Sequence, residues 1–198
     1  MSEPLPLLTT PPPERRDAAR NREALLRAAA ELIEGCDARA VTMDAVAARA
    51  GVGKGTVFRR FGSREGLMAA LLDQAEADWQ QAVLSGPPPL GPGAPAMDRL
   101  LAFGASRTRL HLQQAALIEA AGQVWRTNYA VAGFASMHVR YLLRELGVHG
   151  DLAYLATALN GALAVPVLQQ QLEAEGLSEA QVVGGWQELA RRVTAVRD

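Results

Sequence analysis

Two short helical segments joined by a glycine turn are the feature that most limits how this 198-residue chain can fold. Thr42 can cap the first segment, which ends at Gly51. The second segment starts near Gly53 and ends at Phe61, and Gly62 follows as the residue that stops the helix. A short helix, a glycine turn and a second short helix are typical of the helix-turn-helix motif, in which the turn glycine can adopt a positive φ.

The rest of the chain is also predicted to be helical, because Ala, Leu, Arg, Glu and Gln dominate and alternating β-branched patterns are almost absent. Asn21 or Asp17 can cap a first helix that ends at Gly35, and Ser63 can cap a longer helix that runs to about Val83. Further helices are predicted over approximately residues 96–107, 108–121, 124–146, 151–173 and 178–197. The expected fold class is therefore all-α.

These patterns divide the chain into four parts. Residues 1–14 are interpreted as a disordered arm, residues 15–63 as a helix-turn-helix domain, and residues 64–84 as a connecting helix. Residues 85–198 are expected to form a larger helical domain. It begins with the loop "SGPPPLGPGAP", whose prolines and glycines cannot continue a helix.

The charge of the chain is unevenly distributed, although its net value is only −1. Residues 14–64 hold eleven Lys or Arg against seven Asp or Glu, whereas residues 66–198 hold nine against twelve. A basic N-terminal third joined to an acidic remainder indicates two functions. The basic part is expected to bind polyanions and the acidic part is not.

Nothing in the sequence indicates secretion or a membrane span. The start, "MSEPLPLLTTPPPERR", lacks a basic n-region, and prolines interrupt its apolar residues. Leu152–Leu168 is the most apolar stretch, but it is slightly short for a span and contains Asn160 and Pro166, which favours a buried helix. Cys36 is the single cysteine, so no disulfide can form within the chain, and a lone cysteine is more often packing than a redox sensor. We expect a cytoplasmic protein.

The second segment of the motif has two distinct faces on a helical wheel drawn at about 100° per residue. Val57 and Phe61 point inward. The outer face is small at its N-terminal end, cationic along its length and aromatic at one edge, which suits a helix that enters the major groove. Arg59 can reach guanine acceptors and Phe58 can contact a thymine methyl group. The residues expected on this face and its flanks are Lys54, Gly55, Thr56, Phe58, Arg59 and Arg60.

Other groups around the motif suit the DNA backbone. Lys54 is the only lysine of the chain, and its compact charge suits a phosphate or a guanine. Arg60 and Arg64 suit phosphates, and the N–H groups at the start of the preceding helix, at Thr42 and Met43, can bind another. The alternative is that these are solvated side chains on an ordinary small helical domain.

Residues 21–72 resemble the DNA-binding domain of the tetracycline-repressor (TetR) family of transcription regulators. The stretch "VTMDAVAARAGVGKGTVFRRFGSREGL" follows the family pattern almost position by position. The resemblance implies that Thr42 and the start of its helix contact phosphate, and that the outer residues from Lys54 to Arg60 form the reading surface. Phe58 departs from the family, which usually has a tyrosine there, and it lacks the hydroxyl group that can bond a phosphate.

The resemblance also implies that the C-terminal domain binds a ligand and forms a homodimer through its last two helices. Small residues in "ATALNGALAVP" allow close helix packing, and the last helix carries apolar residues at helical spacing. An intramolecular core is the alternative explanation of the same pattern. The dimer candidates are Ala158, Gly161, Ala162, Val182, Trp186, Leu189 and Val193.

Large apolar residues with a few polar groups on the middle helices are the candidates for a pocket that binds a small, mostly apolar effector. They are Phe103, His111, Gln114, Trp125, Asn128, Tyr129, Phe134, Met137, His138 and Tyr141. Any one of them is more often plain core. The three histidines lack a metal-like spacing with Cys or carboxylates, so neither a metal nor another cofactor is expected.

The prediction is a sequence-specific regulator that binds a palindromic operator in double-stranded DNA as a homodimer and is released by the effector. Two alternatives remain. One is an architectural DNA-binding protein without a ligand, which the large acidic C-terminal domain disfavours. The other is a small helical enzyme, although no nucleophile elbow, phosphate loop or paired-carboxylate motif is present.

Overall fold

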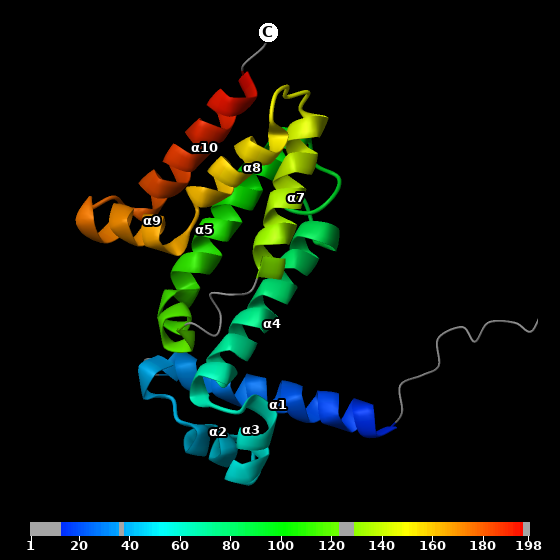
Figure 1. The fold of residues 1–198 in the computed structure, drawn as a ribbon, viewed down its shortest axis with the longest axis vertical. Coiled ribbons are helices and arrows are strands. Elements are labelled where there is room, and N and C mark those ends of the chain that lie inside the picture. Colours follow the sequence, from blue (N-terminus) through cyan, green and yellow to red (C-terminus); the bar gives the residue numbers. More distant parts are fainter. Residues whose placement is uncertain (1–12, 36–37, 123–128, 196–198) are drawn as a thin grey trace, which may run out of the picture. The chain divides into compact units, whose positions relative to one another are not determined.

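The structure, a computed structural model, describes residues 13–35, 38–122 and 129–195. These residues form helices and turns and contain no strand, which confirms the all-α fold class (Figure 1). The chain divides into two compact units, Met1–Leu71 and Leu72–Asp198. The boundary between the units falls within the long helix α4 (Arg64–Ser85).

The smaller unit contains the helix-turn-helix motif. Its elements are α1 (Pro13–Gly35), the 3-10 turn η1 (Ala38–Ala40), α2 (Met43–Arg49), α3 (Lys54–Phe61) and the first turns of α4. The start of α1 differs from the prediction, because the helix begins at Pro13 and not after a cap at Asp17 or Asn21. Proline is well suited to the first turn of a helix, because the N–H groups there have no acceptor within the helix and proline lacks this group.

The core of the smaller unit is built from one apolar residue or more on each helix. Leu25 and Ala29 of α1 and Val46 of α2 are buried, as are Val57 of α3 and Leu67 of α4. Helix α2 packs against both α1 and α3. Burying a side chain of this size stabilises a fold by about 1.5–3 kcal/mol, so these contacts hold α3 in a fixed place relative to α2.

The larger unit is a bundle of the remaining helices. Its elements are the end of α4, α5 (Ala96–Ala121), α7 (Tyr129–Glu145), α8 (Leu152–Gly161), α9 (Val165–Gln169), a π-helical turn (Gln170–Ala174) and α10 (Glu179–Ala195). Helix α7 packs against α5 and α8, and α10 packs against α5 and α8 (Figure 1). The core between these helices includes Trp79, Phe103, Leu142, Leu159 and Trp186.

Two helix boundaries of the larger unit differ from the prediction. Residues 96–121 form one continuous helix and not two, because no helix-breaking residue separates the two predicted halves. The predicted helix 151–173 is broken, and its two parts are bent by 46°. Pro166 explains the break, since a proline within a helix has no N–H group to donate and its ring clashes with the carbonyl of Ala162.

No single helix among the described residues has both the length and the apolar composition that a membrane span requires. One bent pair, Leu152–Gly161 with Val165–Ala174, meets these criteria only when its two parts are taken together.

Candidate nucleic-acid interface and ligand sites

The turn between α2 and α3 is set by Gly51, which has a φ of +66°. The N–H group of Val52 donates a 3.0 Å hydrogen bond to the carbonyl oxygen of Ala47, and the N–H group of Gly51 donates to that of Ala48. This pattern ends α2 and turns the chain back across it. The positive φ predicted for the turn glycine is confirmed, and α3 begins three residues later.

The N-terminus of α2 is capped by Thr42, whose hydroxyl oxygen accepts a 3.2 Å hydrogen bond from the N–H group of Ala45. Met43 follows as the first helical residue, and its side chain is buried in the core of the smaller unit. The prediction that Met43 contacts DNA is therefore limited to its backbone, because a side chain packed inside cannot reach a phosphate.

The outward face of α3 carries the residue types expected of a reading helix. Val57 is fully buried, whereas Gly55, Arg59 and Arg60 are exposed and Phe58 is 40% exposed. Thr56 and Phe61 are half-buried. A Cβ atom added at Gly55 would meet no atom within 4 Å, so this end of the helix is open to a close neighbour.

Lys54 has two contacts that hold it at the start of α3. Its Nζ atom lies 2.8 Å from the carboxylate of Asp44 in α2, and 5.6 Å from the centre of the Phe58 ring. The side chains of the ion pair are 59% and 62% exposed, so the pair contributes at most about 1 kcal/mol. A phosphate can therefore replace Asp44 as the partner of Lys54 at little cost.

Arg64 has a role that the sequence pattern did not reveal. Its Nε–H donates a 2.9 Å hydrogen bond to the carbonyl oxygen of Val41, and its terminal N–H donates to that of Ala38. The side chain thus ties the start of α4 to the segment that precedes Thr42. Since two of its donors are used inside the unit, the predicted phosphate contact of Arg64 competes with a structural role.

A hollow of about 380 Å³ between α1 and α3 adds two residues to the candidate interface. Asn21 and Arg22 of α1 line it together with Thr56, Arg59 and Arg60 of α3. Asn21 and Arg22 were not predicted as site residues from the sequence. Both are polar residues at positions that continue the apolar stripe of α1 toward its N-terminus, and only the packed structure brings them beside α3.

Several ligand candidates on the middle helices do not line an open site. Phe103 is fully buried in the core of the larger unit, and Gln114 is also buried. His111 is half-buried, and its Nδ1 lies 2.6 Å from the carbonyl oxygen of Leu163. Burial, followed by the charge of Arg107, lowers the pKa of His111 from 6.5 to about 4. Trp125, Asn128 and the side chain of Tyr129 lie outside the described residues.

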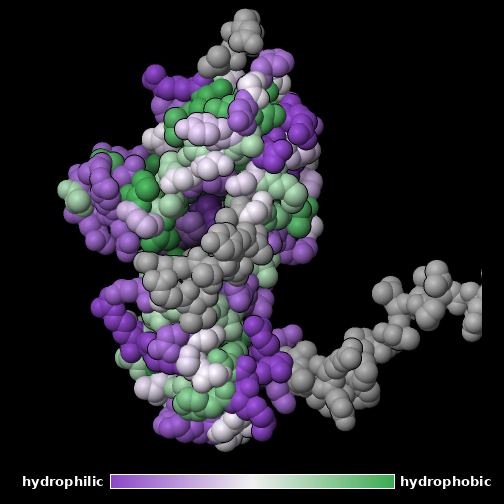
Figure 2. Space-filling view, in the orientation of Figure 1, coloured by the Kyte–Doolittle hydropathy of each residue, from purple (hydrophilic) through white to green (hydrophobic). Residues whose placement is uncertain are grey.

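A buried ion pair lies inside the larger unit. The guanidinium group of Arg107 bonds the carboxylate of Glu76, and both side chains are at most 6% exposed. The guanidinium also lies over the ring of Trp79, 4.5 Å from its centre. Neither partner was predicted from the sequence, because they are 31 residues apart and only the fold brings them together. Figure 2 shows a hollow in this face of the larger unit, with hydrophilic residues at its floor.

Four ligand candidates do come together, at a second hollow of about 630 Å³ on the larger unit. It lies between the end of α4, the start of α5 and α7, and we call it the α7 groove. The rings of Phe134, His138 and Tyr141 form part of its wall, and Met137 is 61% exposed beside them. Burial, followed by the charge of Arg99, lowers the pKa of His138 from 6.5 to about 4, so this ring is neutral at pH 7.

The described residues contain no group of three or more His, Cys, Asp or Glu side chains that could hold a metal ion.

Comparison with known proteins identifies the smaller unit. Residues 25–71, which span the turn and the helix α3 described above, match the family model for "Bacterial regulatory proteins, tetR family". The smaller unit therefore carries a DNA-binding domain of the TetR family. No curated protein sequence matches the chain.

Solved structures share the fold of this chain over most of its length. A TetR transcriptional regulator from Rhodococcus sp. RHA1 is 25% identical, with a TM-score of 0.57, and the match covers 92% of this chain and 99% of that one. A TetR/AcrR-family regulator from Thermobifida fusca YX-ER1 is 20% identical, with a TM-score of 0.63 and coverage of 90% and 100%. NalD, the secondary repressor of the MexAB-OprM multidrug efflux pump in Pseudomonas aeruginosa, is 16% identical, with a TM-score of 0.54 and coverage of 90% and 97%.

The dimer candidates of this chain divide into buried and exposed residues. Val182 and Trp186 are buried inside the larger unit, and Ala162 and Val193 pack against the same core. The prediction that Trp186 faces a partner chain is therefore wrong for this structure. Its indole fills the space between α10 and its neighbours.

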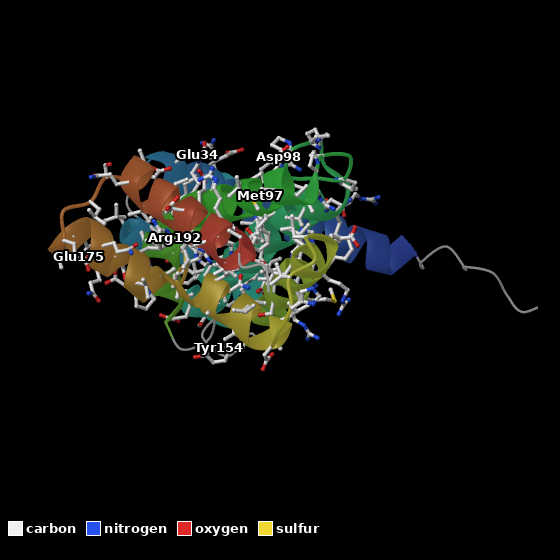
Figure 3. The ribbon with its side chains drawn as sticks, turned by 90° about the horizontal axis from the view of Figure 1, so that it is seen from above. Glu34, Met97, Asp98, Tyr154, Glu175 and Arg192 are labelled. Carbon is white, nitrogen blue, oxygen red and sulfur yellow. The ribbon has the colours of Figure 1, made fainter. Side chains whose placement is uncertain are left out.

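The exposed face of α8 and α10 retains three of the candidates. Ala158 and Gly161 are exposed on α8, and Leu189 is 40% exposed on α10. Tyr154, four residues before Ala158, is 72% exposed and points away from the helices (Figure 3). Tyr154 was not among the predicted dimer residues, although it lies one helical turn before Ala158 on the same face.

Proposed function

We propose that this TetR-family regulator is a repressor that binds a palindromic operator as a homodimer and is released from it by a small, mostly apolar effector. The observation that carries the proposal is the outward face of α3. It combines an open glycine, an aromatic ring and exposed cations on one helix held by a helix-turn-helix core. Such a face suits the major groove of DNA.

The residues of the smaller unit have separate roles in this proposal. Arg59, in the middle of the exposed face, reads a guanine through its O6 and N7 acceptors. Gly55 lets the helix approach closely, and Phe58 contacts a thymine methyl group. Lys54 exchanges Asp44 for a phosphate or a guanine. Arg60 and Arg22 neutralise phosphates, which position the protein without reading sequence.

The exposed face of α8 and α10 is the proposed dimer contact. Ala158 and Gly161 leave room for a second helix to pack closely, while Tyr154 and Leu189 supply apolar area that is otherwise in contact with water. A dimer presents two copies of α3, so it reads two half-sites about one helical turn of DNA apart, or a multiple of that spacing.

Release by an effector is the proposed mode of control, and the repressor role of NalD supports the direction. An effector acts only if it prefers the state of the dimer that binds DNA poorly. A coupling free energy of about 1–3 kcal/mol would weaken operator binding roughly 5- to 150-fold. The same factor must then appear when the affinity for the effector is measured with and without operator.

The proposal is tested by selecting sites from a random double-stranded DNA library and measuring affinity for the selected and for unrelated DNA. We expect a palindromic site, and Arg59→Ala should weaken binding to it by about 1–3 kcal/mol while relaxing its specificity. Arg109→Ala removes an exposed arginine from α5 of the larger unit and serves as the control. Equal losses on specific and unrelated DNA would refute the role of Arg59. Failure to select any sequence would favour an architectural protein.

A further inference from the structure

The α7 groove gathers exposed apolar side chains that a folded unit normally covers. Leu84 is 56% exposed, Met137 61% and Tyr141 43%, and all three line the groove. On α7 the spacing of Met137, Tyr141 and Arg144 places them on one stripe, because residues three and four apart share a helix face. With a volume of about 630 Å³, the groove lies in the range of pockets that hold small molecules.

The charges around the groove have one sign. Arg99, Arg140 and Arg144 line it, whereas no Asp or Glu does. None of the three forms an ion pair with a carboxylate in the described part of the chain. This is unusual in a unit whose charge is negative overall, and it favours an anionic group in the groove.

Two buried nitrogen atoms at the groove also lack an acceptor. Nε of Arg99 and Nε2 of His138 are buried, and neither has a hydrogen-bond partner within the described ranges. The His138 side chain as a whole is only 7% exposed, and it is stacked between Phe103 and Phe134 at centroid distances of 5.5 and 6.0 Å. A buried donor without a partner costs about 1–3 kcal/mol, which an acceptor in the groove would recover.

The two side chains that carry these nitrogens lie near the same aromatic ring. The Arg99 guanidinium lies 5.9 Å from the centre of the Tyr141 ring, and the Tyr141 and His138 rings are 6.2 Å apart. The two side chains with unsatisfied donors therefore both neighbour the Tyr141 ring of the aromatic wall. One ligand can place an anionic group against the arginines while its body covers the rings.

We propose that the α7 groove binds an amphipathic organic anion, a carboxylate carried on an aromatic body, and that this molecule is the effector. The aromatic body covers Phe134, Met137 and Tyr141, and the carboxylate accepts from Arg99 and from the Nε2–H of His138. Arg140 and Arg144 supply further positive charge at the rim. The role as effector rests on the proposed function, but the binding itself does not.

The test uses three probes on the purified full chain: 2-naphthoate, its uncharged analogue 2-naphthamide, and inorganic phosphate. Titration calorimetry at pH 7 should show 2-naphthoate binding at least about tenfold more tightly than 2-naphthamide, since one charge-assisted hydrogen bond is worth that factor or more. Phosphate lacks the aromatic body and should not displace 2-naphthoate at equal concentration.

Variants locate the site. Arg99→Gln should weaken binding of 2-naphthoate about tenfold and leave binding of 2-naphthamide unchanged. Met137→Glu places a negative charge on an exposed position of the groove and should abolish 2-naphthoate binding without affecting the fold. Arg109→Gln is the control, because this exposed arginine of α5 pairs with Glu179 and does not line the groove.

Several results would overturn the assignment. They are equal affinity for 2-naphthoate and 2-naphthamide, equal competition by phosphate, an equal loss in Arg109→Gln, no loss in Arg99→Gln, or a Kd for 2-naphthoate weaker than about 1 mM. The effector role is then tested separately: 2-naphthoate should weaken operator binding by the wild-type protein and not by Arg99→Gln. If the protein selects no operator, the proposed function fails while the binding result stands.

Discussion

The indole Nε1–H of Trp186 donates a 2.9 Å hydrogen bond to the carbonyl oxygen of Leu159, which ties α10 to α8 within one chain. The same ring lies against Gly104 of α5, where an added Cβ atom would be 2.0 Å from Cζ3 of the indole. Trp186 therefore joins three helices of the larger unit. Its place in the core explains why Trp186 is closed to a partner chain, whereas Leu189, the next candidate along α10, is 40% exposed.

Gly104→Ala should destabilise the larger unit by about 1–3 kcal/mol, because the rigid indole must move to admit the methyl group. The free energy of unfolding in urea measures this effect. Gly133→Ala is the matched control on α7, where an added Cβ meets no atom within 4 Å. It should leave stability unchanged or raise it by up to about 1 kcal/mol, since alanine favours helix. Equal effects of the two changes would contradict the packing of Trp186.

Leu189→Arg should convert the proposed dimer into a monomer, because it places a charge in the apolar contact between two copies of α8 and α10. Leu189 is 40% exposed, so the fold of the single chain should survive. Sedimentation velocity gives the oligomeric state. Leu84→Arg, an equally drastic change at a leucine of α4 that is 56% exposed, should leave the dimer intact. An unchanged dimer in Leu189→Arg would place the contact elsewhere.

The sequence predicted best those features that depend on near neighbours. The cap at Thr42, the turn at Gly51 and the inward position of Val57 each follow from a few residues of local pattern, and the structure has all three. Trp186 was misassigned because an apolar stripe has the same spacing whether it packs against its own chain or a partner. Likewise, an arginine at position 64 suits a phosphate contact and a structural role equally well. Only the fold brings the carbonyl oxygens of Ala38 and Val41 to it.

Arg107→Met should lower stability by about 3–5 kcal/mol, because it leaves the buried carboxylate of Glu76 without its positive partner. The double change Glu76→Gln with Arg107→Met removes both charges and should recover much of that loss. Arg192→Met breaks an exposed pair with Glu188 and should cost less than about 1 kcal/mol. Urea unfolding of the single and double variants gives the coupling between Glu76 and Arg107. Strictly additive losses would mean that the two charges do not interact.

Because it contains buried histidines, the larger unit should lose stability in mild acid. Because burial lowers the pKa of His138 from 6.5 to about 4, the unfolded chain binds its proton first as the pH falls. The contribution of neutral His138 to the free energy of unfolding is therefore complete above pH 6.5 and is lost as the pH falls from 6.5 to 4. His138→Phe should therefore reduce the fall in unfolding free energy between pH 7 and pH 5 by about 1–2 kcal/mol.

Arg64→Ala distinguishes a structural role from a phosphate contact. If the guanidinium mainly holds the carbonyl oxygens of Ala38 and Val41, its loss should lower the free energy of unfolding by about 1–3 kcal/mol. The dependence of DNA affinity on salt should then keep its slope, because no phosphate contact is removed. Arg60→Ala should reduce that slope by about one unit and serves as the reference for a phosphate contact. A reduced slope in Arg64→Ala together with unchanged stability would restore the phosphate role that the sequence predicted.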